Sequence, residues 1–203
     1  MTITLHKNDI PDDLKASGAV AIDTETMGLR HLRDPLCLVQ LCFGDGNAHI
    51  VQLDRGSYDA PNLKTLLSDP NTTKIFHFAR FDIAVIKQYL GVACTPVFCT
   101  RTASKLVRTY TDRHGLRENC KELLGIELNK QQQSSYWGAE EISADQLQYA
   151  ANDVLHLHAL MAEFEARLKR EGRSELAQKC FDFLPVRADL DLAGWPDDDI
   201  FAH

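Results

Sequence analysis

The spacing of apolar and polar residues changes along the chain, from short apolar runs in the first half to helical periodicity in the second. Apolar runs at 19–23, 36–43 and 48–53 are separated by brief segments rich in glycine, proline, aspartate and asparagine. Runs of this length between turn-forming residues are typical of β-strands. Their short connections predict an antiparallel meander of three strands.

Helical spacing first occurs at residues 61–69 and 80–90, where apolar side chains recur every three or four positions. Gly91 closes the second of these helices, as glycine commonly does at a helix end. Strands are expected on either side of that helix, at 73–78 and 97–100. These elements together form a βαβ unit.

The rest of the chain is helical in pattern almost to its end. The longest helix is expected from Ala144 to Arg170, because apolar residues recur on one side and Ser143 with Gln146 forms a capping box. A last helix is expected from 174 to about 184, where Pro185 disturbs it.

A strand meander, a βαβ unit and a helical second half predict an α/β fold, with a central mixed five-stranded sheet flanked by helices. The chain of 203 residues suits one hydrophobic core, and no repeat or low-complexity linker interrupts the pattern. We therefore expect one domain over residues 1–203, with its core at 19–170 and a helix and tail at 174–203.

Composition indicates which classes of protein the chain can belong to, and it leaves the predicted fold unchanged. The chain is 44% hydrophobic and 25% charged, and no apolar run reaches the ~18 residues of a membrane span. No secretory signal is visible at the N-terminus, and the six cysteines show neither CxxC pairs nor zinc-site spacing. We expect reduced cysteines, a cytoplasmic location and no membrane partner. The net charge of −7 disfavours a protein that holds long duplex by its phosphates.

Four acids lie among apolar neighbours, where an unpaired carboxylate is costly. Asp23 and Glu25 are one residue apart at a strand end, so their side chains point to the same face. Asp82 lies in the first turn of a helix, and Asp153 lies on the inner side of the longest helix. Singly, these acids are also explained by an exposed strand end, a helix dipole and a salt bridge. One shared cation site explains all of them together.

Tyr149 lies four residues before Asp153, so both side chains project from one helix face. A tyrosine in this position is commonly a core residue that hydrogen-bonds to a neighbour. Beside the other acids, it is a candidate for orienting a water molecule. The candidates then follow the order Asp-x-Glu, Asp and Tyr-x3-Asp.

The segments that carry these residues resemble a known enzyme family. DTET, HFARFD and YAAND resemble, in order, the three exonuclease motifs of the DEDD superfamily, in the subclass with tyrosine in the third motif. The resemblance covers about residues 19–170 and implies an RNase H-like fold. KIFHFARFD, RTYTDRHGL, NKQQQSSYW and the tail AGWPDDDIFAH also resemble the nanoRNase C family, stand-alone bacterial enzymes that degrade very short RNA, notably diribonucleotides.

The resemblance implies a metal-binding role for the four acids, Asp23, Glu25, Asp82 and Asp153. Carboxylate oxygens suit Mg²⁺ or Mn²⁺, and two such ions can clamp the attacking and leaving oxygens of a phosphodiester hydrolysis. Tyr149 is expected to orient the attacking water, because a phenol with a pKa near ~10 takes up little charge.

Substrate contacts are expected close to the acids. In related nucleases a residue near the position of Leu29 contacts a base, although a plain core leucine is an equal alternative. His77 and Phe78 are candidates for ribose or base contact, or else a packed strand end. Thr24 and Thr26 complete this set, because they adjoin Glu25 in the first motif.

A second group of candidates is basic or polar. Residues 101–121 include six basic and two acidic residues, and the spacing of three of the basic ones predicts a shared helix face. A local phosphate site and a solvated surface both fit this pattern, as does a solvated loop for the segment NKQQQSSYW. The candidates are Arg101, Lys105, Arg108, Arg113, His114, Lys130 and Gln133.

The function expected from the resemblance is metal-dependent 3′-5′ hydrolysis of very short RNA to 5′-mononucleotides. The alternatives are a broader enzyme like RNase D, which trims longer RNA such as tRNA 3′ ends, an exonuclease on DNA, and an inactive binding module. An inactive module is expected to lack some of the acids, and all four are present. The resemblance also implies a ring-like homo-octamer.

Overall fold

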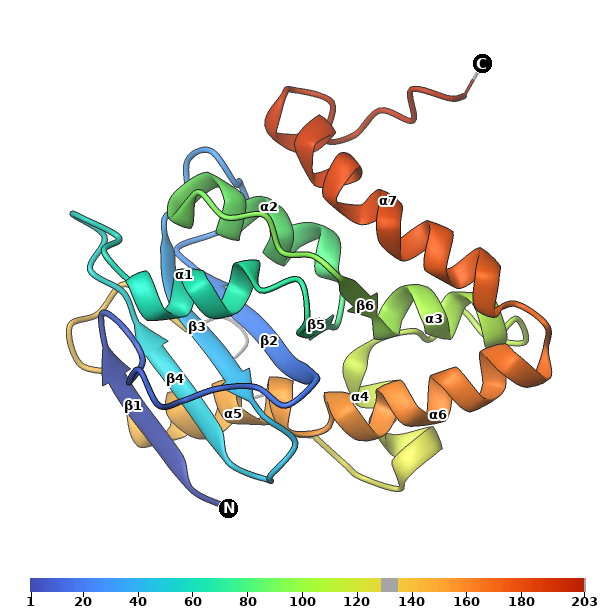
Figure 1. Cartoon of the computed structure of the whole chain (residues 1–203), viewed down its shortest axis with the longest axis horizontal. Coiled ribbons are helices and arrows are strands. Elements are labelled where there is room, and N and C mark those ends of the chain that lie inside the picture. Colours follow the sequence, from blue (N-terminus) through green and yellow to red (C-terminus); the bar gives the residue numbers. More distant parts are fainter. Residues whose placement is uncertain (129–134, 203) are drawn as a thin grey trace.

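The computed structural model describes residues 1–128 and 135–202 and has a six-stranded mixed sheet at its centre (Figure 1). The strand order is β1-β4-β3-β2-β5-β6, and β2, β3 and β4 form the predicted antiparallel meander. Strands β1, β5 and β6 add to it in parallel pairings. The strands are β1 (Ile3–Lys7), β2 (Ala19–Thr26), β3 (Leu36–Cys42), β4 (Ala48–Gln52), β5 (Thr73–Phe76) and β6 (Val97–Cys99).

The α/β class is confirmed, but the prediction of five strands is wrong, because β1 (Ile3–Lys7) is a sixth. This edge strand is only half-buried, and its partner is β4, forty-five residues away at the pairing of Ile3 with Ala48. A short, mixed segment of this kind gains its strand conformation from a distant neighbour, which local periodicity does not show.

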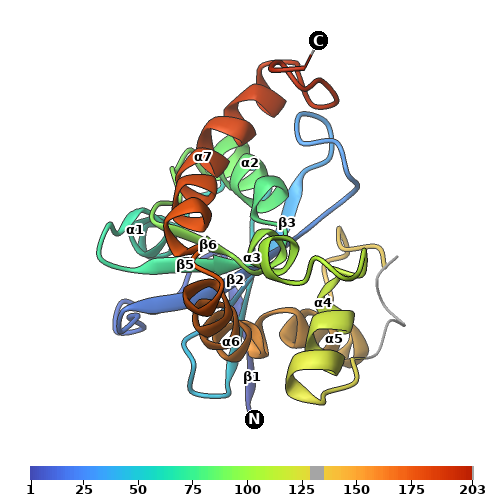
Figure 2. The same ribbon diagram turned by 90° about the vertical axis from the view of Figure 1, so that its right-hand side faces the viewer.

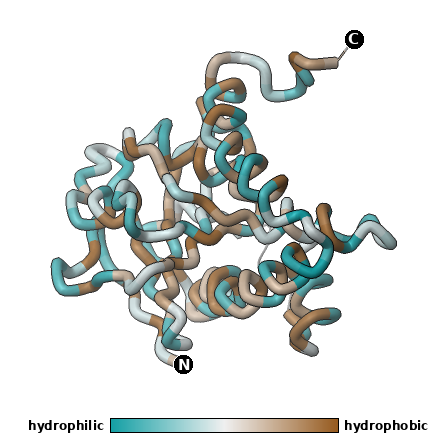
Figure 3. The backbone as a smooth tube through the Cα atoms, turned by 45° about the vertical axis from the view of Figure 1, so that its right-hand side comes forward, coloured by the Kyte–Doolittle hydropathy of each residue, from teal (hydrophilic) through white to brown (hydrophobic). Residues whose placement is uncertain are grey.

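Helices cover both faces of the sheet (Figure 2). Helix α5 packs against β2, β3 and β4 on one face, while α2 and α7 pack against each other over the opposite face. Apolar residues, brown in Figure 3, recur along the strands and helices of the interior. The helices are α1 (Pro61–Ser68), α2 (Ala79–Leu90), α3 (Thr100–Val107), α4 (Leu116–Asn119), the π-helix η1 (Cys120–Leu124), α5 (Ala144–Leu155), α6 (Leu157–Arg170) and α7 (Ser174–Leu192).

Two predicted helices differ from those observed. The single helix expected over 144–170 is two helices that meet at His156, whose φ of −104° and ψ of −2° redirect the chain. The redirection lets α5 cover the sheet while α6 packs against α3. The last helix does not end at Pro185 but continues to Leu192, because Ala188 and Asp191 remain buried beyond the proline.

The parallel strands β2, β5 and β6 point their carboxyl ends to the same edge of the sheet. Residues that follow these ends therefore come together in space, as in other α/β sheets that bind ligands. Asp23 and Glu25 lie near the end of β2, and His77 follows β5. The fold thus gathers several predicted site residues at one edge.

Two further findings bear on the sequence predictions. All six cysteines, which lie in the described part of the chain, are free, and five of them are buried. In residues 1–128 and 135–202, no helix combines the length and hydropathy that a membrane span requires.

Candidate active site

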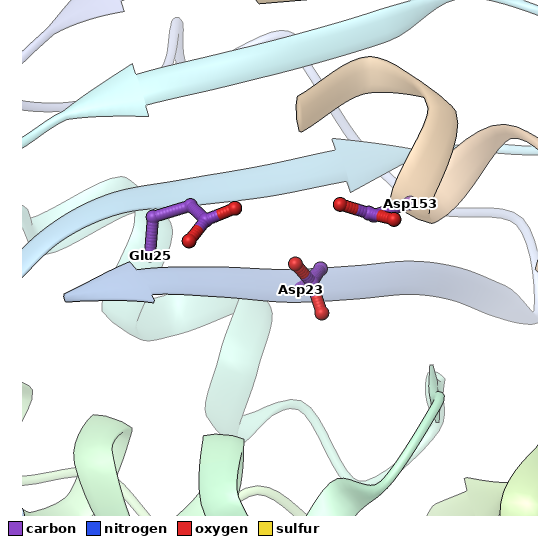
Figure 4. Close-up of side chains that lie close together, drawn as sticks. All are labelled: Asp23, Glu25 and Asp153. Carbon is purple, nitrogen blue, oxygen red and sulfur yellow. The ribbon is translucent and has the colours of Figure 1, made fainter. Parts of the chain in front are cut away.

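Three of the predicted acids form one compact group (Figure 4). Asp23 and Glu25 project from the same face of β2, as strand alternation requires, and Asp153 reaches them from α5. One carboxylate oxygen from each residue lies within 4.8 Å of the other two. Among the described residues, this is the one group of His, Cys, Asp or Glu side chains whose geometry could hold a metal ion.

The fourth acid, Asp82, approaches from the opposite face of β2. Thr24 points away from its neighbours Asp23 and Glu25, and its hydroxyl donates a hydrogen bond of 2.7 Å to Asp82 Oδ1. Both residues are buried. The structure therefore places three acids together and holds the fourth beside them through Thr24, which fixes the orientation of the Asp82 carboxylate.

The electrostatics of the site favour a cation. Burial raises the pKa of Asp23 to about 7. Burial and then the charges of neighbouring acids hold the pKa values of Glu25, Asp82 and Asp153 well above the usual range. Carboxylates that are costly to ionise together become favourable when they share a hard divalent ion. This donor set of oxygens fits Mg²⁺ or Mn²⁺.

Tyr149 lies beside this group, one helical turn before Asp153 on α5. Burial, together with the negative charges of Asp153, Glu25 and Asp23, raises the pKa of its phenol, which also hydrogen-bonds to Asp153. The phenol is therefore neutral and able to donate or accept a hydrogen bond. The ring of Trp137 packs against it, with centroids 6.1 Å apart.

A cavity of about 600 Å³ opens over the three clustered acids. Leu29 is at its rim and is 82% exposed, so the alternative of a core leucine is excluded. Gly28 lets this turn pass close to Asp34, since a Cβ at Gly28 would lie 2.2 Å from Asp34 Oδ2. The cavity lining also contains residues that the predicted site left out, among them Phe81, Leu116 and Trp137.

Two of the predicted substrate contacts sit at the carboxyl end of β5. His77 lines the cavity and its Nδ1 lies 2.8 Å from the Thr100 hydroxyl. Burial, with the charge of Arg101, lowers the pKa of His77 to about 3, so the ring is neutral. Phe78 is a half-exposed side chain in a left-handed conformation, with φ of 72°, and the Arg101 guanidinium lies 5.2 Å from its ring centroid.

The predicted shared face of basic residues is wrong for Arg108. Its guanidinium is 1% exposed and donates to Asn119 Oδ1 at 2.6 Å and to the Arg113 carbonyl at 2.7 Å, and it pairs with Glu122. The cause is that α3 ends at Val107, so Arg108 leaves the helix and turns inward. Arg108 is therefore structural and unavailable to a substrate phosphate.

The other basic and polar candidates differ in their exposure to solvent, and two of them lie outside the residues that the structure describes. His114 is buried and its Nδ1 lies 2.9 Å from the Ser104 hydroxyl. Lys105 and Arg113 are exposed. Lys130 and Gln133 lie outside the described residues, so their predicted substrate contacts stay predictions.

Comparison with known proteins identifies the family of this chain. A family model described as 3′-5′ exonuclease matches residues 6–169. The chain belongs to this 3′-5′ exonuclease family. The match includes all four acids and Tyr149, so the resemblance seen in the motifs extends over most of the chain.

Solved structures similar to this 3′-5′ exonuclease chain include Brucella melitensis NrnC bound to pGG, at 56% identity and a TM-score of 0.97, covering 100% of this chain and 99% of that one. Brucella melitensis NrnC with bound Mg²⁺ is 55% identical, with a TM-score of 0.96 and full coverage of both chains. NrnC is nanoRNase C, so the predicted resemblance to it is confirmed.

A curated relative, ribonuclease D of Gluconacetobacter diazotrophicus, is 33% identical over 173 residues, which are 85% of this chain and 44% of the relative. The chain thus spans less than half the length of this relative. The family and the acid group together indicate that this site uses divalent metal.

Proposed function

We propose that the protein is a metal-dependent 3′-5′ exoribonuclease that hydrolyses very short RNA, including diribonucleotides, to 5′-mononucleotides. The observation that carries the proposal is the group of Asp23, Glu25 and Asp153 beside Tyr149, under one open cavity. Family membership supports the reaction class, and the chemistry of the donor set supports the metal dependence.

The residues of this chain divide the work of the reaction. Asp23, Glu25 and Asp153 would hold divalent metal, with Asp82 oriented nearby by Thr24. Two bound ions, Mg²⁺ or Mn²⁺, would activate the attacking water and stabilise the leaving 3′-oxygen. Tyr149 orients that water through its neutral hydroxyl, so that its lone pair points at the scissile phosphate.

The preference for short RNA is supported by the size and charge of the site. The cavity over the acids holds about 600 Å³, and the accessible basic candidates are few, namely Arg101, Lys105 and Arg113. A compact site with few accessible basic residues around it suits a short substrate better than a long backbone track. The relative at 56% identity bound pGG, which agrees with a short substrate.

Rates on RNA strands of two to twenty nucleotides, with matched DNA strands, test the proposal. We expect the dinucleotide to be hydrolysed fastest, and chelator or Asp23→Asn to abolish cleavage of every strand. Equal or faster cleavage of the longer RNA would favour the broader, RNase D-like alternative. Faster cleavage of DNA would assign the site to DNA instead.

Two further expectations belong to this proposal. A cytoplasmic location is supported by the six free cysteines, which suit a reducing compartment. A homo-oligomeric assembly, an octamer by family resemblance, is supported by the exposed apolar side chains of α7 and the segment that follows it.

A further inference from the structure

We infer that Arg55 is a positioning residue that fixes Trp137 against Tyr149, an inference that rests on the proposed function. Arg55 follows β4, and its guanidinium links Met27 to the backbone that follows Trp137. Nη1 lies 2.9 Å from Met27 Sδ, and Nη2 donates a 2.9 Å hydrogen bond to the Gly138 carbonyl. Met27 follows the acids of β2 and lines the cavity, as does Trp137.

The Arg55 guanidinium lies directly against the backbone of Gly138. A Cβ at Gly138 would lie 2.7 Å from Arg55 Nη1 and 2.9 Å from the Tyr136 ring. Arg55 therefore packs directly on the backbone that leaves Trp137 and holds its carbonyl by a hydrogen bond.

Other side chains hold this segment on both sides of Trp137. Before it, Gln146 Nε2 donates to the Tyr136 carbonyl at 3.3 Å. After it, Gln52 Nε2 donates to the Ala139 carbonyl at 2.8 Å, and Lys7 Nζ donates to the Glu140 carbonyl at 3.2 Å. The last two contacts join the segment to strands β1 and β4. Arg55 holds the part that directly follows Trp137, where a displacement reaches the active site.

Trp137 transmits the position of this segment to the catalytic group. It is 3% exposed, and its ring packs on Tyr149, whose hydroxyl bonds to Asp153. Without the Arg55 contacts, Trp137 loses one side of its support, and the Tyr149 hydroxyl loses its fixed direction. A misplacement of about 1 Å costs up to ~100-fold in rate.

A direct role for Arg55 in binding phosphate fits less well. Arg55 also lines a neighbouring cavity of about 630 Å³ that has Trp137 as a shared wall. The charged residues that line this neighbouring cavity are two bases and three acids, Lys7, Arg55, Asp54, Glu140 and Glu141. This excess of acidic residues disfavours the binding of a phosphate in the neighbouring cavity. The contacts of Arg55 therefore point to a role in positioning Trp137.

Arg55→Gln and Arg55→Lys test the inference, with Arg170→Ala as the matched control. Arg170 is also an exposed arginine, and its ion pair with Glu171 lies at the end of α6. We expect both Arg55 variants to lose roughly 10- to 100-fold in kcat on a dinucleotide, with KM and Mg²⁺ affinity nearly unchanged. Lysine fails because an ammonium is a point charge and cannot replace the two-pronged guanidinium.

Tryptophan fluorescence provides a second measurement that does not depend on activity. The chain has two tryptophans, so the Trp195→Phe background isolates the emission of Trp137. Its emission should move to longer wavelength in both Arg55 variants and stay unchanged in Arg170→Ala. Gly138→Ala, whose added Cβ would displace the Arg55 guanidinium from the segment, should show the same shift and the same loss of kcat.

Wild-type kcat and emission in Arg55→Gln would overturn the inference and leave the proposed function standing. Full activity in Arg55→Lys would also overturn it, because charge alone would then suffice. If the wild-type protein does not hydrolyse RNA, the proposed function fails, while the emission of Trp137 still decides whether Arg55 holds it.

Discussion

At the scale of single residues, the four acids of the site are costly to ionise, because burial and mutual repulsion raise their pKa values. The pKa of Asp23 is raised from about 4 in an unfolded chain to about 7 in the folded one. A raised carboxyl pKa stabilises the fold below the unfolded value, and this stabilisation is lost as the pH rises through the folded pKa. The acid group is thus a destabilising element at neutral pH that a divalent ion would relieve.

We therefore expect the melting temperature in chelator to fall as the pH rises from about 4 to about 8. Mg²⁺ should raise the melting temperature most at the upper end of this range, where the acids are free to ionise and bind it. Thermal melts at several pH values with and without Mg²⁺ measure both effects. Asp23→Asn should flatten the dependence, and an equally steep fall in that variant would assign the titration to other groups.

Tyr149 gives a second prediction at this scale. Tyr149→Phe should lower kcat by at least about 100-fold, because the water loses the hydroxyl that orients it while the acids are untouched. Calorimetric titration with Mn²⁺ should give nearly the wild-type affinity. Full activity of the variant would remove Tyr149 from the mechanism, and a lost metal affinity would make it part of the metal site instead.

At the scale of elements, Arg108 supports the turn between α3 and α4. Arg108→Met should lower the free energy of unfolding by about 3 kcal/mol, because the Arg113 carbonyl loses its Arg108 donor, the buried Asn119 Oδ1 keeps only its bond from Ser104, and Glu122 loses its ion pair. Arg101→Met is the control, since Arg101 is less buried and stacks on Phe78. Urea unfolding measures both, and equal small effects would show that the buried network around Arg108 contributes little.

Features set by local rules could be predicted from the sequence, whereas features set by distant packing could not. The motifs predict the acids and Tyr149 because strand alternation and the helical repeat are local rules, and the sheet then brings them together. The turn of Arg108, the break at His156 and the continuation of α7 past Pro185 depend instead on distant packing partners. The family resemblance places the segment of Trp137 near the active site, but the place of Trp137 in the cavity wall depends on its packing against Tyr149, which the polar segment itself does not show.

At the scale of the whole molecule, apolar side chains gather where a globular surface is usually polar. Along α7 and the tail, Phe183, Val186, Trp195, Ile200 and Phe201 are between 39% and 75% exposed. The tail also lies against α2 and α7, because Arg80 and Arg187 pair with Asp191 and donate to the Pro196 carbonyl. Exposed apolar groups on an anchored segment are typical of an interface between subunits.

The proposed homo-oligomer therefore predicts a mass in solution several times the 22.8 kDa of one chain. Phe201→Asp combined with Val186→Asp should reduce that mass, since a charge in an apolar contact is costly to bury. Analytical ultracentrifugation gives the mass, and circular dichroism establishes that the variant remains folded. A wild-type chain that sediments as a monomer contradicts the assembly. An unchanged mass in the double variant would place the interface elsewhere, because these side chains would then face solvent in every subunit.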